Sequence, residues 1–436
     1  MLCIFTIFIQ VAYGQSVSFA NDIAPIIYTK CASCHHKGGV APFALISYDQ
    51  VKRHAKMIKL VTEIKYMPPL KADPQYARYA NYHTLTDQEI ALISRWVKLG
   101  ANRGEGTEKP YSEYLTSSKS VEWGKPDLVV KLDSFLHQGD NKERFIIYRK
   151  NIILPSDTTV CHCEFEPGNK KIIHHMDAFI YHFTPQTIFA NNTNIITEDT
   201  FRTEYAKNYY LKMFNHNGTM AIKELTSVVD YFPGALPVTY PAGIAKTFKI
   251  KQKSAIVVSS VHYGFSSAPE WDKSLFKFWY CKKSPKRKIL TMVLGSPDHP
   301  IKPALELQPN EAKKCSTRIN VAFDISMVSI QPHMHLIGRR FKSYALTPTG
   351  DTIRLIRIHD WDFRWQRSYK YKYPVKIPKG SIIYAEAWYD NTTNNPYNPS
   401  HPPQKVGHSI HTKDEMLQLW LFFMPYQQGD EKLSLE

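Results

Sequence analysis

Short runs of alternating hydrophobic and polar residues dominate the chain beyond residue 126 and predict β-strands. We expect strands at 127–132, 144–154, 255–262, 288–294, 318–330, 381–389 and 415–424. Clusters of Pro, Gly and Asn separate these runs, as in antiparallel sandwiches. Because roughly 300 residues exceed one small sandwich, the pattern predicts two all-β sandwich domains, at 127–285 and 286–436. One stretch with helical periodicity lies at 198–213.

The N-terminal part of the chain has helical rather than alternating spacing. Thr86 and Glu89 form a capping-box pattern that opens a helix, and Gly100 is placed to end it. A shorter helix is expected around 21–28. Residues 103–126 carry Gly, Glu, Lys, Pro and Ser without apolar periodicity, so they are expected to form a linker. We therefore predict a small all-α domain, at 15–102, ahead of the two sandwiches.

The first fourteen residues are apolar and precede Gln15 with the small-residue pattern of a signal-peptide cleavage site. They are too short to span a bilayer, and no later segment is long and apolar enough, so we expect no stable membrane span. The protein is predicted to be exported, to a bacterial periplasm or outside the cell. Its net charge of +16 would suit an acidic partner. No nucleic-acid-binding module accompanies that charge, so we expect no nucleic-acid partner.

The run Cys31-Ala32-Ser33-Cys34-His35 has the C-x-x-C-H spacing at which haem c is attached. Two thioethers would hold the porphyrin, and His35 would bind the iron. Met67, before two prolines, offers a thioether for the sixth position. A chance dithiol or a zinc site are the alternatives for the motif. The rival sixth ligands are His36, His54 and Met57. Residues 15–102 resemble a class I cytochrome c domain in the order of these features.

Four cysteines remain after the haem motif and Cys3 of the signal segment are set aside. They are Cys161, Cys163, Cys281 and Cys315. An even number in an oxidising compartment favours structural disulfide bonds over a thiolate metal site. Four cysteines allow three pairings, and the sequence does not choose among them.

Three histidine clusters interrupt the β-rich region. His333 and His335 are two residues apart, so on a strand both imidazoles would project to one face, as two ligands of one metal require. His174 and His175 are adjacent and would share a metal only at a bulge or a strand end. His262 ends an apolar strand. Imidazoles suit copper or zinc, and an added thioether favours copper. Each cluster taken singly is more typical of packed or surface histidines.

The order His-His-Met, His-Tyr, His-x-His and Asp-Glu-Met resembles the copper type II, ascorbate-dependent monooxygenases over residues 123–430. The resemblance implies two jelly-roll-like domains with a copper ion in each. It implies an electron-transfer copper bound by His174, His175 and His262, and an oxygen-activating copper bound by His333, His335 and Met416. The expected reaction is hydroxylation of a substrate C–H bond with O2, with the haem and a periplasmic electron donor supplying electrons.

Three positions depart from that family. Gln331 stands where the peptide-amidating enzyme has an arginine that binds the substrate carboxylate, Trp420 replaces a tyrosine, and Ser260 replaces a common glutamine. Peptide amidation and dopamine hydroxylation are therefore disfavoured, and the small-molecule substrate stays open. The alternatives to a monooxygenase are an electron-transfer protein without oxygenase activity, a copper-binding module, and a zinc hydrolase.

Overall fold

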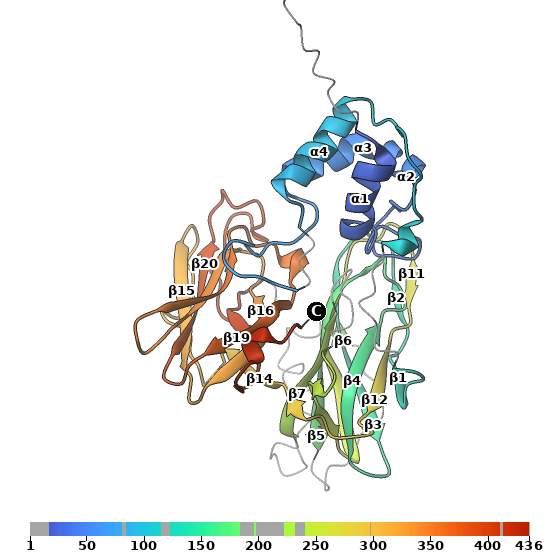
Figure 1. The fold of residues 1–436 in the computed structure, drawn as a ribbon. Coiled ribbons are helices and arrows are strands. Elements are labelled where there is room, and N and C mark those ends of the chain that lie inside the picture. The colour runs from blue at the N-terminus through green and yellow to red at the C-terminus, as the bar shows by residue number, and fades with distance from the viewer. Residues whose placement is uncertain are drawn as a thin grey trace, which may run out of the picture. The chain divides into compact units, whose positions relative to one another are not determined.

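The structure is a computed structural model that describes residues 17–80, 84–114, 123–183, 196–197, 222–231, 240–296, 298–409 and 413–435. The chain divides into two compact units (Figure 1). Unit 1 comprises Met1–Pro69 and His83–Ser117, and unit 2 comprises Leu70–Tyr82 and Ser118–Glu436.

Unit 1 is helical in its described part. Its elements are η1 (Phe19–Ile23), α1 (Ala24–Lys30), α2 (Tyr48–Arg53), α3 (Ala55–Glu63), α4 (Asp87–Lys98) and η2 (Tyr111–Glu113). The predicted capping box is confirmed: the Glu89 amide donates to the Thr86 hydroxyl at 3.1 Å, and the Thr86 amide donates to the Glu89 carboxylate at 2.7 Å. Trp96 of α4 is buried against Phe19, with ring centroids 5.7 Å apart. These helices are short, and a cytochrome c domain stays a prediction.

Twelve of the strands in the described part of unit 2 form what we call the first sandwich. They are β1 (Leu128–Lys131), β2 (Phe135–His137), β3 (Arg144–Ile153), β4 (Thr158–Glu166), β5 (Ile173–Phe183), β6 (Ile196–Thr197), β7 (Ile222–Tyr231), β8 (Ile244–Ala245), β9 (Phe248–Ile250), β10 (Lys253–Tyr263), β11 (Glu270–Asp272) and β12 (Leu275–Tyr280). The two main sheets have the orders β1-β12-β4-β9 and β6-β3-β10-β5-β7. Alternate residues of both sheets, such as Phe276 and Ile180, share one buried core.

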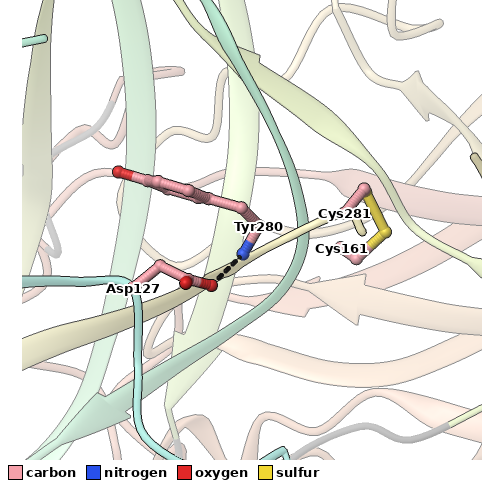
Figure 2. The surroundings of a disulfide bond; sticks show 4 residues. All are labelled: Asp127, Cys161, Tyr280 and Cys281. Atoms are coloured by element: carbon pink, nitrogen blue, oxygen red, sulfur yellow. Dashed lines mark hydrogen bonds between the residues drawn. A yellow bond between two sulfur atoms is a disulfide. The ribbon is translucent and has the colours of Figure 1, made fainter. Parts of the chain in front are cut away.

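A disulfide bond joins Cys161 of β4 to Cys281, which follows β12, with Cα atoms 5.0 Å apart. Figure 2 shows the bond beside Tyr280, whose amide donates to the Asp127 carboxylate at 2.8 Å. The bond links the ends of two paired strands of one sheet. The expected disulfide chemistry is confirmed for Cys161 and Cys281, whereas Cys163 and Cys315 belong to the cores of different sandwiches and are free thiols.

The second sandwich follows the short strand β13 (Arg287–Lys288). Its elements are β14 (Leu290–Leu294), β15 (Ala312–Asn320), β16 (Ile325–His333), β17 (Gly338–Leu346), β18 (Thr352–Ile358), η4 (Phe363–Trp365), β19 (Tyr369–Ile377), β20 (Ile382–Asp390), β21 (Gln418–Pro425) and η5 (Asp430–Lys432). Its sheets have the orders β14-β21-β16-β19 and β15-β20-β17-β18, and apolar side chains from both enclose its core.

Two predicted strands differ from the observed ones. The run 318–330 is two strands, because the chain turns at 321–324 and passes from the sheet of β15 to that of β16. The run 415–424 begins as a strand only at Gln418; Glu415 makes an isolated bridge with His408 instead. The first error arises because continuous apolar spacing does not record where the chain passes from one sheet to another.

The segment Leu70–Tyr82 belongs to unit 2, although its sequence lies inside the range 15–102. Tyr79 pairs with Tyr371 of β19 and donates its hydroxyl hydrogen to the Leu355 carbonyl at 2.8 Å. The Asp73 carboxylate accepts a hydrogen bond from the Arg357 Nε at 2.9 Å. This segment therefore packs against the second sandwich.

Several predictions fall on residues outside the described part of the chain. They are the signal segment 1–14, most of the linker's C-terminal half (115–122) and the helix at 198–213. No helix among the described residues has the length and apolar character that crossing a membrane requires.

Candidate metal centres

The first site comprises His174 and His175 of β5 and His262 of β10, which are neighbouring strands in one sheet. His175 lies directly opposite His262, and the register then shifts so that Ile173 opposes Tyr263. His174 therefore sits in a bulge, the feature that adjacent histidines need in order to approach one metal. The ring centroids of His174 and His175 each lie 5.0 Å from that of His262.

The chemical state of these imidazoles suits a metal ion. Burial lowers the pKa of His174 and holds the pKa values of His175 and His262 well below the usual value. The rings are therefore neutral near pH 7, which is the form that binds metal. The Nδ1 atoms of His174 and His175 are buried and have no hydrogen-bond partner among the described residues. Such atoms are costly to bury without a partner, so the site fits a copper ion at these nitrogens.

Local packing holds the first site in place. A Cβ atom at Gly264 would lie 2.3 Å from the His174 Nε2, so only glycine leaves room for this ring. The Tyr263 hydroxyl donates to the buried Asp272 carboxylate at 2.8 Å. The same carboxylate accepts from the Asn169 amide at 3.0 Å, in the turn that precedes β5. Asp272 of β11 thus links the end of β10, through Tyr263, to the turn that precedes β5, through Asn169.

The second site is built around His333, at the end of β16, and His335, with ring centroids 5.1 Å apart. The His333 Nδ1 bonds to the Gln366 side-chain oxygen, and the His335 Nδ1 bonds to the Asp414 carbonyl at 3.0 Å. Because these acceptors engage Nδ1–H, the Nε2 atoms keep their lone pairs for a metal. Burial lowers the pKa of His333 to about 4, so this ring is neutral near pH 7.

The buried Glu415 carboxylate organises the main chain of the second site. It accepts from the His335 amide at 2.8 Å, from the Ile337 amide at 2.7 Å and from the Met416 amide at 3.2 Å. Burial raises its pKa to about 8, against the opposing effect of these amides. The Met416 carbonyl accepts from the Tyr389 hydroxyl at 2.7 Å. Glu415 thus joins the segments that carry His335 and Met416.

Phe363 of η4 is packed against both sets of histidines. Its ring centroid lies 5.2 Å from that of His175, 6.2 Å from that of His262 and 5.8 Å from that of His335. The ring is 7% exposed. One apolar side chain of the second sandwich therefore contacts ligand candidates of both sites.

The residues proposed for haem lie in unit 1. Cys31 and Cys34 follow α1 as free thiols, and burial raises the pKa of Cys31 to about 12. The His35 Nδ1 bonds to the Phe43 carbonyl at 3.1 Å, which leaves Nε2 for a metal. Met67 follows α3, and its amide donates to the Val61 carbonyl at 3.0 Å. Free thiols with an oriented histidine fit a covalently attached haem.

Four residues at these sites were not predicted from the sequence: Glu143, Phe363, Gln366 and Glu415. The sequence could have indicated Glu415, since it directly precedes the candidate ligand Met416. It could not have indicated Gln366, because 33 residues separate it from His333. The Glu143 carboxylate, 119 residues from His262, bonds to that ring at 3.0 Å. Two further histidines precede Met416 in the sequence: His408 is exposed, and His411 lies outside the described residues.

Comparison with known proteins adds one finding for the second sandwich. Residues 287–433 match the family model for the C-terminal domain of copper type II ascorbate-dependent monooxygenases. This range contains His333, His335 and Met416. The second sandwich is therefore similar to the C-terminal domain of these copper-dependent monooxygenases. No curated protein matches the chain.

Solved structures show only remote likeness. The chain is 9% identical to the subviral particle protein VP2 of infectious bursal disease virus, with a TM-score of 0.19 over 72% of this chain and 75% of that chain. It is 10% identical to PNGF-II in one crystal form, with a TM-score of 0.22 over 79% of this chain and 71% of that chain. Similarity at this level carries no argument about fold or function.

Proposed function

We propose that the protein is an exported, copper-dependent monooxygenase that hydroxylates a C–H bond of a small-molecule substrate with O2. The observation that carries the proposal is the second site. Two histidines are held there by Nδ1 bonds to Gln366 and Asp414, Glu415 accepts from the amides of both His335 and Met416, and all these residues lie within the range that matches the monooxygenase model. Copper bound by His333, His335 and Met416 would supply the O2 chemistry.

The chain's own residues prepare this site. Asp414 and Gln366 fix the imidazole tautomers, and the Glu415 carboxylate fixes the main chain on both sides of the ligands. Gln331 lies two residues before His333 on β16 and is 7% exposed, and its side-chain oxygen has no hydrogen-bond partner among the described residues. A neutral acceptor here suits a substrate that brings a hydroxyl or amide hydrogen, rather than a carboxylate.

Hydroxylation consumes two electrons for each O2, and we assign their delivery to the first site and to unit 1. His174, His175 and His262 would hold a second copper, and Cys31, Cys34, His35 and Met67 would hold haem c. The free thiols and the oriented His35 support this assignment. Disulfide formation between Cys161 and Cys281 supports an oxidising compartment, in keeping with export to the periplasm and a periplasmic electron donor.

The test is incorporation of ¹⁸O from ¹⁸O2 into products during a small-molecule screen, with protein matured in a host that attaches haem c. We expect incorporation by the wild-type protein and a loss of at least about tenfold in Met416→Ala, because the thioether ligand is absent. Met292→Ala removes a half-buried methionine of β14 in the same sandwich and should retain activity.

Full activity in Met416→Ala would contradict the assignment of the active copper. Bound haem and copper with no ¹⁸O in any product would favour the alternative, an electron-transfer protein without oxygenase activity.

A further inference from the structure

The carboxylate of Glu143 approaches the first site from outside the histidine set. Its Oε1 lies 3.0 Å from the His262 Nε2, and the His262 side chain is 2% exposed whereas that of Glu143 is 38% exposed. Oxygen and nitrogen atoms of Glu143, His174 and His262 that are able to bind a metal all lie within 4.8 Å of one another. Glu143 directly precedes β3, whose Phe145 pairs with His262, so the sheet register places the carboxylate here.

We infer that Glu143 is a positioning residue that fixes the tautomer of His262 and tunes the copper ion of the first site. This inference rests on the proposed function. A carboxylate that accepts the Nε2–H of an imidazole leaves the Nδ1 lone pair for the metal. His174 and His175 also present buried Nδ1 atoms, so all three rings would offer the same nitrogen.

The two sites differ in the charge of the groups that form hydrogen bonds with their histidines. The Nδ1–H groups of His333 and His335 meet a side-chain amide oxygen and a main-chain carbonyl, both neutral. His262 meets a carboxylate. A negative group beside a ligand makes the imidazole a stronger donor and stabilises Cu(II) relative to Cu(I). The first copper should therefore be reduced, by one electron, at a lower potential than the second.

Arg364 is the cation that opposes this effect. It interacts electrostatically with both Glu143 and His174. Its guanidinium is already bound by the Asp362 carboxylate, at 2.7 and 2.9 Å. Because Asp362 largely compensates Arg364, the carboxylate of Glu143 stays available to His262.

The chain offers a matched control for this pair. The Glu164 carboxylate lies 2.8 Å from the Nε2 of His162, which is also buried and in the first sandwich. His162 packs between the rings of Trp123 and Trp279 rather than among histidines. Glu164→Gln therefore removes the same type of charge from the same type of pair, away from the site.

The experiment compares Glu143→Gln, Glu143→Asp and Glu164→Gln in the full chain loaded with copper. Copper stoichiometry, affinity in competition with a chelator, and an EPR-monitored redox titration are measured. For Glu143→Gln we expect the affinity of one copper to fall roughly 10–100-fold and its midpoint potential to rise. Glu143→Asp keeps the charge and should shift the potential less, while Glu164→Gln should match the wild type.

Two outcomes separate the inference from the proposed function. Two coppers with unchanged affinity and midpoint potential in Glu143→Gln would overturn the role of Glu143 alone. A wild-type protein that binds no copper would overturn the proposed function, and the inference with it.

Discussion

The first and second candidate metal centres differ in which ring nitrogen their histidines have available for a metal. At the first site the histidines present Nδ1 from a bulge in one sheet, and a carboxylate lies outside them. At the second site Nδ1 is occupied by neutral acceptors, so Nε2 is the nitrogen that would bind the proposed copper, and a buried carboxylate binds the main chain instead. Two sites built from histidines can therefore differ in their properties. The hydrogen-bond partners of the imidazoles determine which ring nitrogen is available to a metal, and the charge of those partners affects how strongly that nitrogen donates.

The largest effect should come from removing the carboxylate that organises only the second site. Glu415→Ala leaves three buried amides without their acceptor, so we expect a loss of roughly 4 kcal/mol in the free energy of unfolding. Chemical denaturation of the copper-free protein measures it. Glu306→Ala, which removes an exposed ion pair with Lys405 in the same sandwich, should cost under about 1 kcal/mol. Equal losses in the two variants would refute the organising role of Glu415.

The second prediction concerns Phe363, the side chain that contacts histidines of both sites. Phe363→Ala removes a buried ring that touches His175, His262 and His335. We expect a cost of about 3 kcal/mol and weaker binding of both coppers, because the cavity loosens both sets of rings. Calorimetry and copper titration measure these quantities. Phe323→Ala, at a ring that is 44% exposed, serves as the control. If only one copper is weakened, the ring does not support both sites.

The smallest effect is a dependence of stability on pH. The folded-state pKa of Glu415 is raised to about 8 by burial, above its unfolded value. Its protonated form therefore stabilises the fold below about pH 4.3, and this contribution is lost as the pH rises through 8. This contribution declines from about pH 4.3 to about pH 8. Above about pH 6.5 buried histidines such as His333 no longer bind protons in either state, so there we expect the stability of the copper-free protein to fall with pH and Glu415→Gln to flatten this decline. An identical slope in the variant would show that another group titrates.

The sequence predicted the repeated local patterns well. The capping box of Thr86 and Glu89 and the alternation of most strands depend on neighbouring residues, so they are visible in the chain. The bulge at His174 was named from the sequence only as one condition under which two adjacent histidines could share a metal, and the register shift between β5 and β10 meets that condition. The strand change within 318–330 was missed, because a turn between sheets leaves the apolar spacing unbroken.

The partners of the sites could not be predicted in this way. Gln366, Phe363 and Glu143 reach the histidines through strand pairing and loop packing across long stretches of chain. The pairing of Cys161 with Cys281, 120 residues apart, is likewise a consequence of the β4–β12 ladder. Spacing identifies which residues bind a metal more readily than which residues tune it.

The central claim is that one chain holds a haem and two distinct copper sites, and metal analysis with copper EPR tests it most directly. On protein matured in a host that attaches haem c, we predict one haem iron and two type 2 coppers per chain, with one copper lost in Met416→Ala. Iron without copper would leave a haem protein joined to two sandwiches, and would contradict the account of both sites.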